Sequence, residues 1–163
     1  DLEGLKLRVM ESQLMVDMAK ALGATVIPMP YKEVYSAIQR GIIDGAENNY
    51  PSYDATRHYE VAPYYTIDEH VRIPELLIAS QKIKERISED DLEIIKACAK
   101  KSQEFQREKW LAKEKEADKK LKDAGVIITR IENRSEFAKA VSPLYDQYAS
   151  KYSEIIKQVQ DME

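Results

Sequence analysis

The sequence has 163 residues, of which 44% are hydrophobic and 33% are charged, a composition typical of one globular domain with a hydrophobic core. The formal net charge of −4 argues against general binding to nucleic acid, which depends on lysine and arginine at the phosphates. The single cysteine, Cys98, excludes an intrachain disulfide and a cysteine metal cluster. No apolar run approaches the ~20 residues that a membrane-spanning helix needs.

Short apolar runs alternate with helical patterns over the first 80 residues, which indicates α/β units. Strands are predicted over 5–10, 25–29, 42–48 and 71–80. Helices are predicted after Ser12, which is a candidate N-cap, and over 31–41. The tyrosine- and proline-rich passage before residue 71 is left without an assigned element. Pro74 predicts a kink or an edge position in the last of these strands.

The second half of the chain is predicted to be mainly helical. A long helix is expected over about 89–122, with Ser88 at its N-cap and with Ile95 and Phe105 on its inner side. A strand over 126–131 follows. One or two helices complete the chain, with Pro143 in a first turn and Tyr152 and Ile155 facing inward. Cys98 lies inside the long helix and is interpreted as a buried structural thiol.

The sequence contains no recognisable catalytic or metal-binding motif. HExxH, GxSxG, P-loop and glycine-rich dinucleotide patterns are absent, and His58 and His70 lack the spacing of metal ligands. We therefore expect no enzyme activity, no cofactor and no metal site. An enzyme that uses Glu47 and His70 is kept as a minor alternative.

Four residues at three places in the chain are candidates for ligand binding, and each place has two interpretations. Arg8 lies between Leu7 and Val9 in a predicted strand, where it either forms an ion pair with Glu11 or Asp17 or clamps a carboxylate with its planar guanidinium. The adjacent amides of residues 48 and 49 either form a turn or bind a ligand's hydroxyls or carboxylate. Tyr31 either packs on the core or offers its ring to a ligand.

Four motifs occur in order along the first third of the chain. They are G-x-K-x-R-V at 4–9, L-G-A at 22–24, P-M-x-[FY]-x-E-V-Y at 28–35 and D-G-x-E-N at 44–48. With these motifs, and with HYEVAPYY and PELLIASQK further on, the chain resembles the C-terminal half of solute-binding proteins of tripartite ATP-independent periplasmic (TRAP) transporters, the C4-dicarboxylate-receptor-like family. The resemblance covers essentially the whole chain.

The resemblance implies an α/β fold, namely one lobe of a two-lobed periplasmic binding protein followed by a long helix and C-terminal helices. Residues 1–80 would form the second ligand-binding lobe and end in the inter-lobe crossing strand. Residues 81–163 would form the long spanning helix, one strand and the C-terminal helices. The N-terminal lobe is expected to be missing from this chain, which would leave apolar surface uncovered and favour a homodimer.

The resemblance also implies a function and a set of binding residues. It predicts a periplasmic receptor that carries a small organic acid to the membrane subunits of a TRAP transporter. Arg8 would form the salt bridge to the ligand carboxylate, Asn48 would contact the same group, and Tyr31 would pack beside the ligand. In open α/β sheets ligands bind beyond the carboxyl ends of the strands, where these residues are expected to meet.

Further polar residues near this edge predict a hydroxylated ligand. Asn49, Glu47 and His70 offer additional donors and acceptors, and "AENN" with "EHVRIPE" resembles the branch of the family that takes sugar acids such as hexuronates. Glu47 has a second interpretation as the group that orients Arg8, and His70 as a structural histidine. A dicarboxylate or other simple carboxylate receptor is the alternative function, and a regulatory or interaction module is the second alternative.

Overall fold

A computed structural model of the chain describes residues 2–161 and contains two small parallel sheets with helices around them. The strands are β1 (Lys6–Val9), β2 (Thr25–Pro28), β3 (Gly45–Ala46), β4 (Tyr64–Ile67) and β5 (Ile127–Arg130). The α-helices are α1 (Gln13–Ala21), α2 (Val34–Gln39), α3 (Tyr50–Ala55), α4 (Glu89–Asp123), α5 (Ser135–Val141), α6 (Pro143–Ala149) and α7 (Ser153–Gln160). Short 3₁₀ helices are η1 (Tyr31–Glu33), η2 (His58–Glu60), η3 (Gln81–Glu85) and η4 (Ser150–Tyr152).

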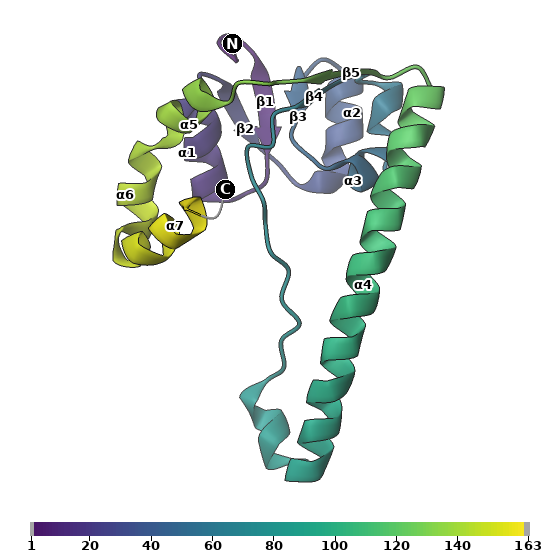
Figure 1. Cartoon of the computed structure of the whole chain (residues 1–163). Coiled ribbons are helices and arrows are strands. Elements are labelled where there is room, and N and C mark those ends of the chain that lie inside the picture. The colour runs from purple at the N-terminus through teal and green to yellow at the C-terminus, as the bar shows by residue number, and fades with distance from the viewer. Residues whose placement is uncertain (1, 162–163) are drawn as a thin grey trace.

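The first sheet has the order β2-β1-β3, with β1 in the centre and all strands parallel. Alternation along β1 sends Leu7 and Val9 to the face covered by α1, where Val9 packs with Met15 and Met18. The C-terminal helices α5 and α6 cover α1 on that side, and α2 lies on the other side of the sheet (Figure 1). Arg8 has the opposite phase to Val9, so it lies away from the α1 core.

The second sheet pairs β4 with β5 in parallel and rests on a cluster of tyrosines. Tyr53 of α3, Leu121 of α4 and Val126 form the buried centre, and Tyr50, Tyr59, Tyr65 and Ile128 pack around it. We call these seven residues the tyrosine cluster. An ion pair of 2.6 Å between Lys120 Nζ and Asp54 Oδ1 also joins α4 to α3. The cluster therefore attaches the C-terminal end of α4 to the first half of the chain.

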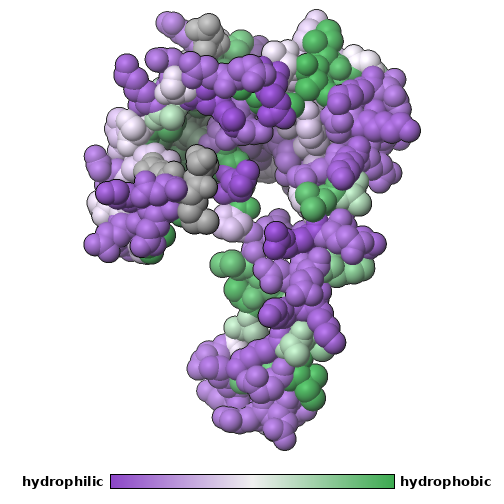
Figure 2. Space-filling view, viewed as in Figure 1, coloured by the Kyte–Doolittle hydropathy of each residue, from purple (hydrophilic) through white to green (hydrophobic). Residues whose placement is uncertain are grey.

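The N-terminal part of α4 and the segment 71–80 project away from the rest of the protein (Figure 1). All ten residues of this segment are exposed, and Ile78 retains 84% of its accessible surface. Hydrophobic surface is visible on this projection in Figure 2. The expected strand over 71–80 is not formed, because no strand of the described chain lies beside it to pair with its backbone.

Several other expectations are corrected by the structure. Ile95, Phe105 and Cys98 lie exposed on α4, because no element covers that part of the helix. Tyr152 and Ile155 are likewise exposed at the C-terminal end, where three α-helices replace the expected one or two. Among the described residues, no helix is both long and apolar enough to cross a membrane.

Helix α3 was not expected from the sequence, although its start carries two recognisable signals. Asn49 is its N-cap and accepts a hydrogen bond of 3.0 Å from the Ser52 backbone N–H, and Pro51 lies in the first turn. The helix begins only four residues after β3. It therefore turns the chain sharply at the edge of the sheet where the candidate binding residues gather.

Candidate functional site

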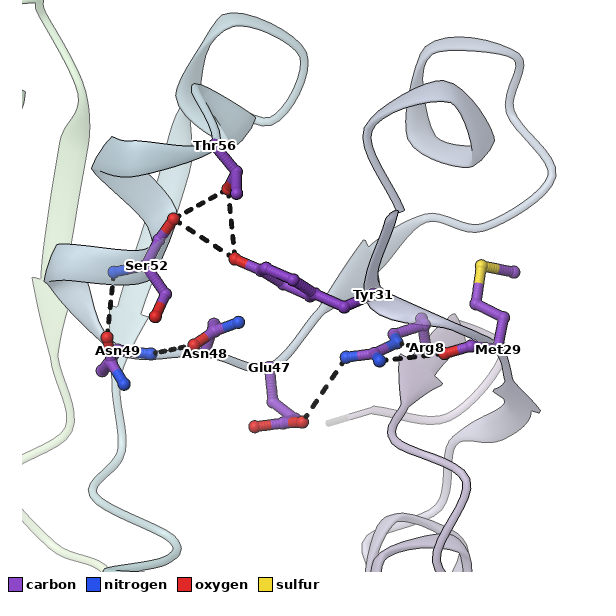
Figure 3. A network of polar contacts seen from close by, with 8 residues as sticks. All are labelled: Arg8, Met29, Tyr31, Glu47, Asn48, Asn49, Ser52 and Thr56. Carbon is purple, nitrogen blue, oxygen red and sulfur yellow. Dashed lines mark hydrogen bonds and ion pairs between the residues drawn. The ribbon is translucent and has the colours of Figure 1, made fainter. Parts of the chain in front are cut away.

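Arg8 is the central charged residue of the site, and its side chain is buried. It is 5% exposed, at the carboxyl half of the central strand β1. Its Nε and Nη2 donate to the Met29 carbonyl at 3.0 and 2.9 Å, just beyond the end of β2 (Figure 3). Neither of the ion-pair partners that the sequence suggested, Glu11 and Asp17, pairs with it, and Asp17 instead accepts a hydrogen bond from Tyr148. The Met29 carbonyl thus fixes one edge of the guanidinium.

Glu47 approaches the other edge of the guanidinium. Its Oε1 lies 3.9 Å from Arg8 Nη1, which is too long for a direct hydrogen bond but within the range of an ion pair (Figure 3). Burial raises the pKa of Glu47, while His70 and Arg8 oppose that rise. Glu47 therefore faces the part of Arg8 that a bidentate carboxylate would need. This position agrees with its interpretation as a group that orients Arg8.

Tyr31 forms one side of the space around Arg8. Its ring centroid lies 5.6 Å from the Arg8 guanidinium carbon, within the range of a cation–π contact. Its hydroxyl donates to the Ser52 carbonyl at 3.2 Å and lies 3.1 Å from Thr56 Oγ1, so α3 holds the far end of the side chain (Figure 3). The buried His58 packs edge-on against the ring, with 5.3 Å between ring centroids. Tyr31 is therefore a rigid aromatic wall.

Both oxygen atoms of Asn48 accept hydrogen bonds from within the protein. Its backbone carbonyl accepts a hydrogen bond of 2.6 Å from the Tyr65 hydroxyl, and its Oδ1 accepts one of 2.9 Å from the Asn49 backbone N–H. Its side chain is directed toward Tyr31 in Figure 3. The side-chain NH₂ group is therefore the part of Asn48 that can donate to a ligand.

Asn49 has a different role in the structure from that of Asn48. Its side-chain oxygen caps α3 through the Ser52 N–H, and its side chain turns to the start of that helix (Figure 3). The contacts of both Asn48 and Asn49 agree with the turn interpretation, because each side-chain oxygen accepts a hydrogen bond from a nearby backbone N–H. The expectation that Asn49 contacts a ligand hydroxyl stays a prediction, and only its NH₂ group is left for that contact.

His70 lies beyond β4 and forms a half-buried pair with Asp68. Its Nδ1 is 2.7 Å from Asp68 Oδ1, and this hydrogen bond raises the pKa of His70. Within residues 2–161, the buried Nε2 of His70 has no hydrogen-bond partner. Its charge acts on Glu47, which places both groups in one electrostatic environment. His70 is thus anchored at one nitrogen and available at the other.

Strand β1, which carries Arg8, and the segments that follow β2 and β3, which carry Tyr31, Glu47 and Asn48, bring these groups to one edge of the sheet. A buried cation, an aromatic wall, an amide donor and a carboxylate acceptor suit recognition of an anion that also carries hydroxyls. No cluster of metal-ligating side chains is found in the described part of the chain. His58 and Tyr65, which support the site from behind, are the first and last residues of HYEVAPYY, but that motif gave no sign of the side chains that they contact at the site.

Comparison with known proteins agrees with this architecture. Residues 1–151 match the family described as bacterial extracellular solute-binding protein, family 7. A solute-binding protein of Chromohalobacter salexigens is 40% identical over all 163 residues, which make up 48% of that protein. The chain therefore spans about half the length of this curated relative.

Two solved structures of TRAP periplasmic solute-binding proteins show the same fold. One from Bradyrhizobium, in complex with D-galacturonate, is 42% identical with a TM-score of 0.89, over 99% of this chain and 54% of that one. One from Chromohalobacter salexigens, with bound D-glucuronate, is 41% identical with the same TM-score and the same coverage. The fold is thus that of the TRAP periplasmic receptors. The chain belongs to the bacterial extracellular solute-binding protein family 7, and the predicted family and α/β fold are confirmed.

Proposed function

We propose that this chain is the carboxylate-binding part of a periplasmic receptor that delivers a hexuronate to the membrane subunits of a TRAP transporter. The observation that carries the proposal is the buried Arg8 guanidinium, which is fixed at one edge by the Met29 carbonyl and faces Glu47 at the other, where the 3.9 Å separation from Nη1 leaves the N–H groups of that edge without a direct hydrogen bond among the described residues. The structural similarity to receptors with bound galacturonate and glucuronate supports a uronate as the ligand.

The carboxylate end of the ligand would be recognised by three residues. Arg8 would offer Nη1 and the remaining N–H of Nη2 to the two carboxylate oxygens, a geometry that only a guanidinium provides. The Asn48 NH₂ group would donate to the same carboxylate, and the Tyr31 ring would pack on the sugar. Because an ion pair strengthens when water is removed, the pair would be strongest in a closed cleft. A partner lobe would supply that closure.

The sugar hydroxyls would be recognised by groups that a simple carboxylate does not need. Glu47 offers acceptor oxygens close to Arg8, and the buried Nε2 of His70 lacks a partner among the described residues. The NH₂ group of Asn49 is a third candidate. A ligand without hydroxyls would leave the Glu47 oxygens and His70 Nε2 without a hydrogen-bond partner in a partly buried site, which costs binding free energy. This favours a hydroxylated acid over a C4-dicarboxylate.

Calorimetry on the full-length gene product that carries this sequence tests the proposal. The panel contains D-galacturonate, D-glucuronate, succinate, and D-galactose as the analogue without a carboxylate. We expect binding of at least one uronate, at least about 100-fold weaker binding of succinate and no binding of galactose, because a site with unpaired polar groups discriminates strongly. Preferred binding of succinate would instead identify a dicarboxylate receptor. Absence of binding by every acid would favour an interaction module.

A further inference from the structure

We propose that Tyr65 is a positioning residue for ligand recognition, because its hydroxyl fixes the backbone of Asn48 and thereby the place where the Asn48 amide is presented. This inference rests on the proposed function of the site. Tyr65 does not itself have to touch the ligand. Its hydroxyl donates to the Asn48 carbonyl at 2.6 Å, across 17 residues of sequence, and so connects β4 to the segment after β3.

The chain around Asn48 has little other support. Strand β3 has only two residues, and its last pair with β1 joins Ala46 to Arg8. Asn48 lies beyond that pair and before the first residue of α3, Tyr50, so neither a strand ladder nor a helix holds its backbone. The hydrogen bond from Tyr65 therefore supplies the fixed point that regular secondary structure supplies elsewhere.

Tyr65 is well placed to act as such a fixed point. It lies in β4, where it pairs with Ile128 of β5, and its ring stacks on Tyr50 with 4.6 Å between centroids. The ring of Tyr53 also packs against the Tyr65 ring, with 5.0 Å between the ring centroids. Burial raises the pKa of Tyr65, so its hydroxyl stays protonated and remains a donor throughout the neutral pH range. The support for Asn48 thus comes from the tyrosine cluster.

The same cluster offers a matched control. Tyr53 also donates its hydroxyl to a backbone carbonyl, that of Ala62, at 2.5 Å. Tyr53→Phe and Tyr65→Phe remove the same phenolic oxygen from two tyrosines whose rings touch each other. The hydrogen bond that Tyr53→Phe removes is accepted by Ala62, in the segment before β4, whereas the one that Tyr65→Phe removes is accepted by Asn48. A merely structural effect would appear in both variants, and a positioning effect only in Tyr65→Phe.

Calorimetry with D-galacturonate and D-glucuronate on the full-length gene product tests the role in binding. We expect Tyr65→Phe to weaken uronate binding by up to about tenfold, the range for one hydrogen bond, and Tyr53→Phe to leave it unchanged. In an Asn48→Ala background, Tyr65→Phe should cause no further loss, because the residue acts through the missing amide. Equal losses in the two phenylalanine variants, or an undiminished loss in the Asn48→Ala background, would overturn the inference.

A measurement without ligand separates this inference from the proposed function. In the free protein, NMR relaxation of the Asn48 side-chain amide should show a lower order parameter in Tyr65→Phe, approaching the flexible range below about 0.6, and no change in Tyr53→Phe. If wild type binds no uronate, the proposed function fails, while this comparison still decides whether Tyr65 positions Asn48. An unchanged Asn48 order parameter in Tyr65→Phe would refute the positioning role.

Discussion

Replacing Arg8 by lysine separates the charge of this residue from its planar geometry. Lysine keeps the positive charge beside Glu47 but has a single nitrogen, so it cannot hold the Met29 carbonyl and a bidentate carboxylate at the same time. We expect Arg8→Lys to fold with reduced stability and to lose most of its affinity for uronates. Alanine is a poorer test, because it would leave the partly buried Glu47 without its cationic neighbour.

The size of both effects follows from the contacts of Arg8. Loss of a hydrogen bond from a charged donor to the Met29 carbonyl costs ~1.5–3 kcal/mol of unfolding free energy. For a chain of this size, that lowers the melting temperature by about 3–12 °C. Truncation of one partner of a buried charge pair costs ~2–5 kcal/mol in binding. Because lysine retains the charge, we expect the lower end, about 30-fold weaker binding.

Calorimetry with both uronates and thermal unfolding without ligand measure the two effects. Arg40→Lys is the control, because Arg40 is exposed on the surface and its Nε only donates to the Ser36 carbonyl at 3.1 Å. That variant should resemble wild type in both assays. If Arg8→Lys binds uronates within about threefold of wild type, the bidentate clamp is refuted, because a loss that small is under 1 kcal/mol.

Further predictions concern Asn49, the two histidines and the exposed apolar surface. Asn49→Ala should lower the unfolding free energy by ~1 kcal/mol, whereas Asn49→Ser should not, because serine can also cap α3. Both variants lack the Asn49 amide, so an equal fall of uronate affinity in the two would indicate that this amide contacts the ligand. The pKa of His70 is raised in the folded protein, so His70 contributes stability below pH ~6.5 that is lost as pH rises through this raised pKa. The unfolding free energy of His70→Gln, measured by denaturation at several pH values, should lack this decline. A pH profile of stability identical to that of the wild type would contradict the prediction. The lowered pKa of the buried His58 has the opposite sign, with stability lost as pH falls. Isolated residues 1–163 should associate with rising concentration through the exposed 71–80 segment and α4, whereas light scattering that shows a clean monomer would argue against it.

Local patterns were sufficient to predict most of the regular elements. β1, β2 and the 35-residue helix α4 appear close to their expected bounds, because alternation and capping are properties of neighbouring residues. The segment 71–80 has the composition of a strand, yet a strand also requires a partner, which no local pattern reveals. The same limitation explains the exposed Phe105 on α4, whose apolar side faces solvent.

The residue pattern by itself pointed most clearly to Arg8, a charged side chain between two apolar residues of a strand. The ligand roles expected for Tyr31 and Asn48 came from the family resemblance, and in the structure these two residues and Glu47 lie around Arg8. Its main partner is a backbone carbonyl, which carries no signature in the sequence. The hydrogen bond from Tyr65 to Asn48 depends on how two sheets are joined, so it could be found only in three dimensions.

The attachment of α4 has a mechanical consequence for the site. At 1.5 Å per residue, its 35 residues form a rod about 50 Å long, and Leu121, near its end, is buried in the tyrosine cluster, to which Tyr65 also belongs. A small tilt of that rod moves its distant tip through a large arc. Conversely, a load applied at the tip produces a torque on the tyrosine cluster. The attachment of the long helix and the hydrogen bond from Tyr65 to the Asn48 carbonyl therefore share one buried cluster.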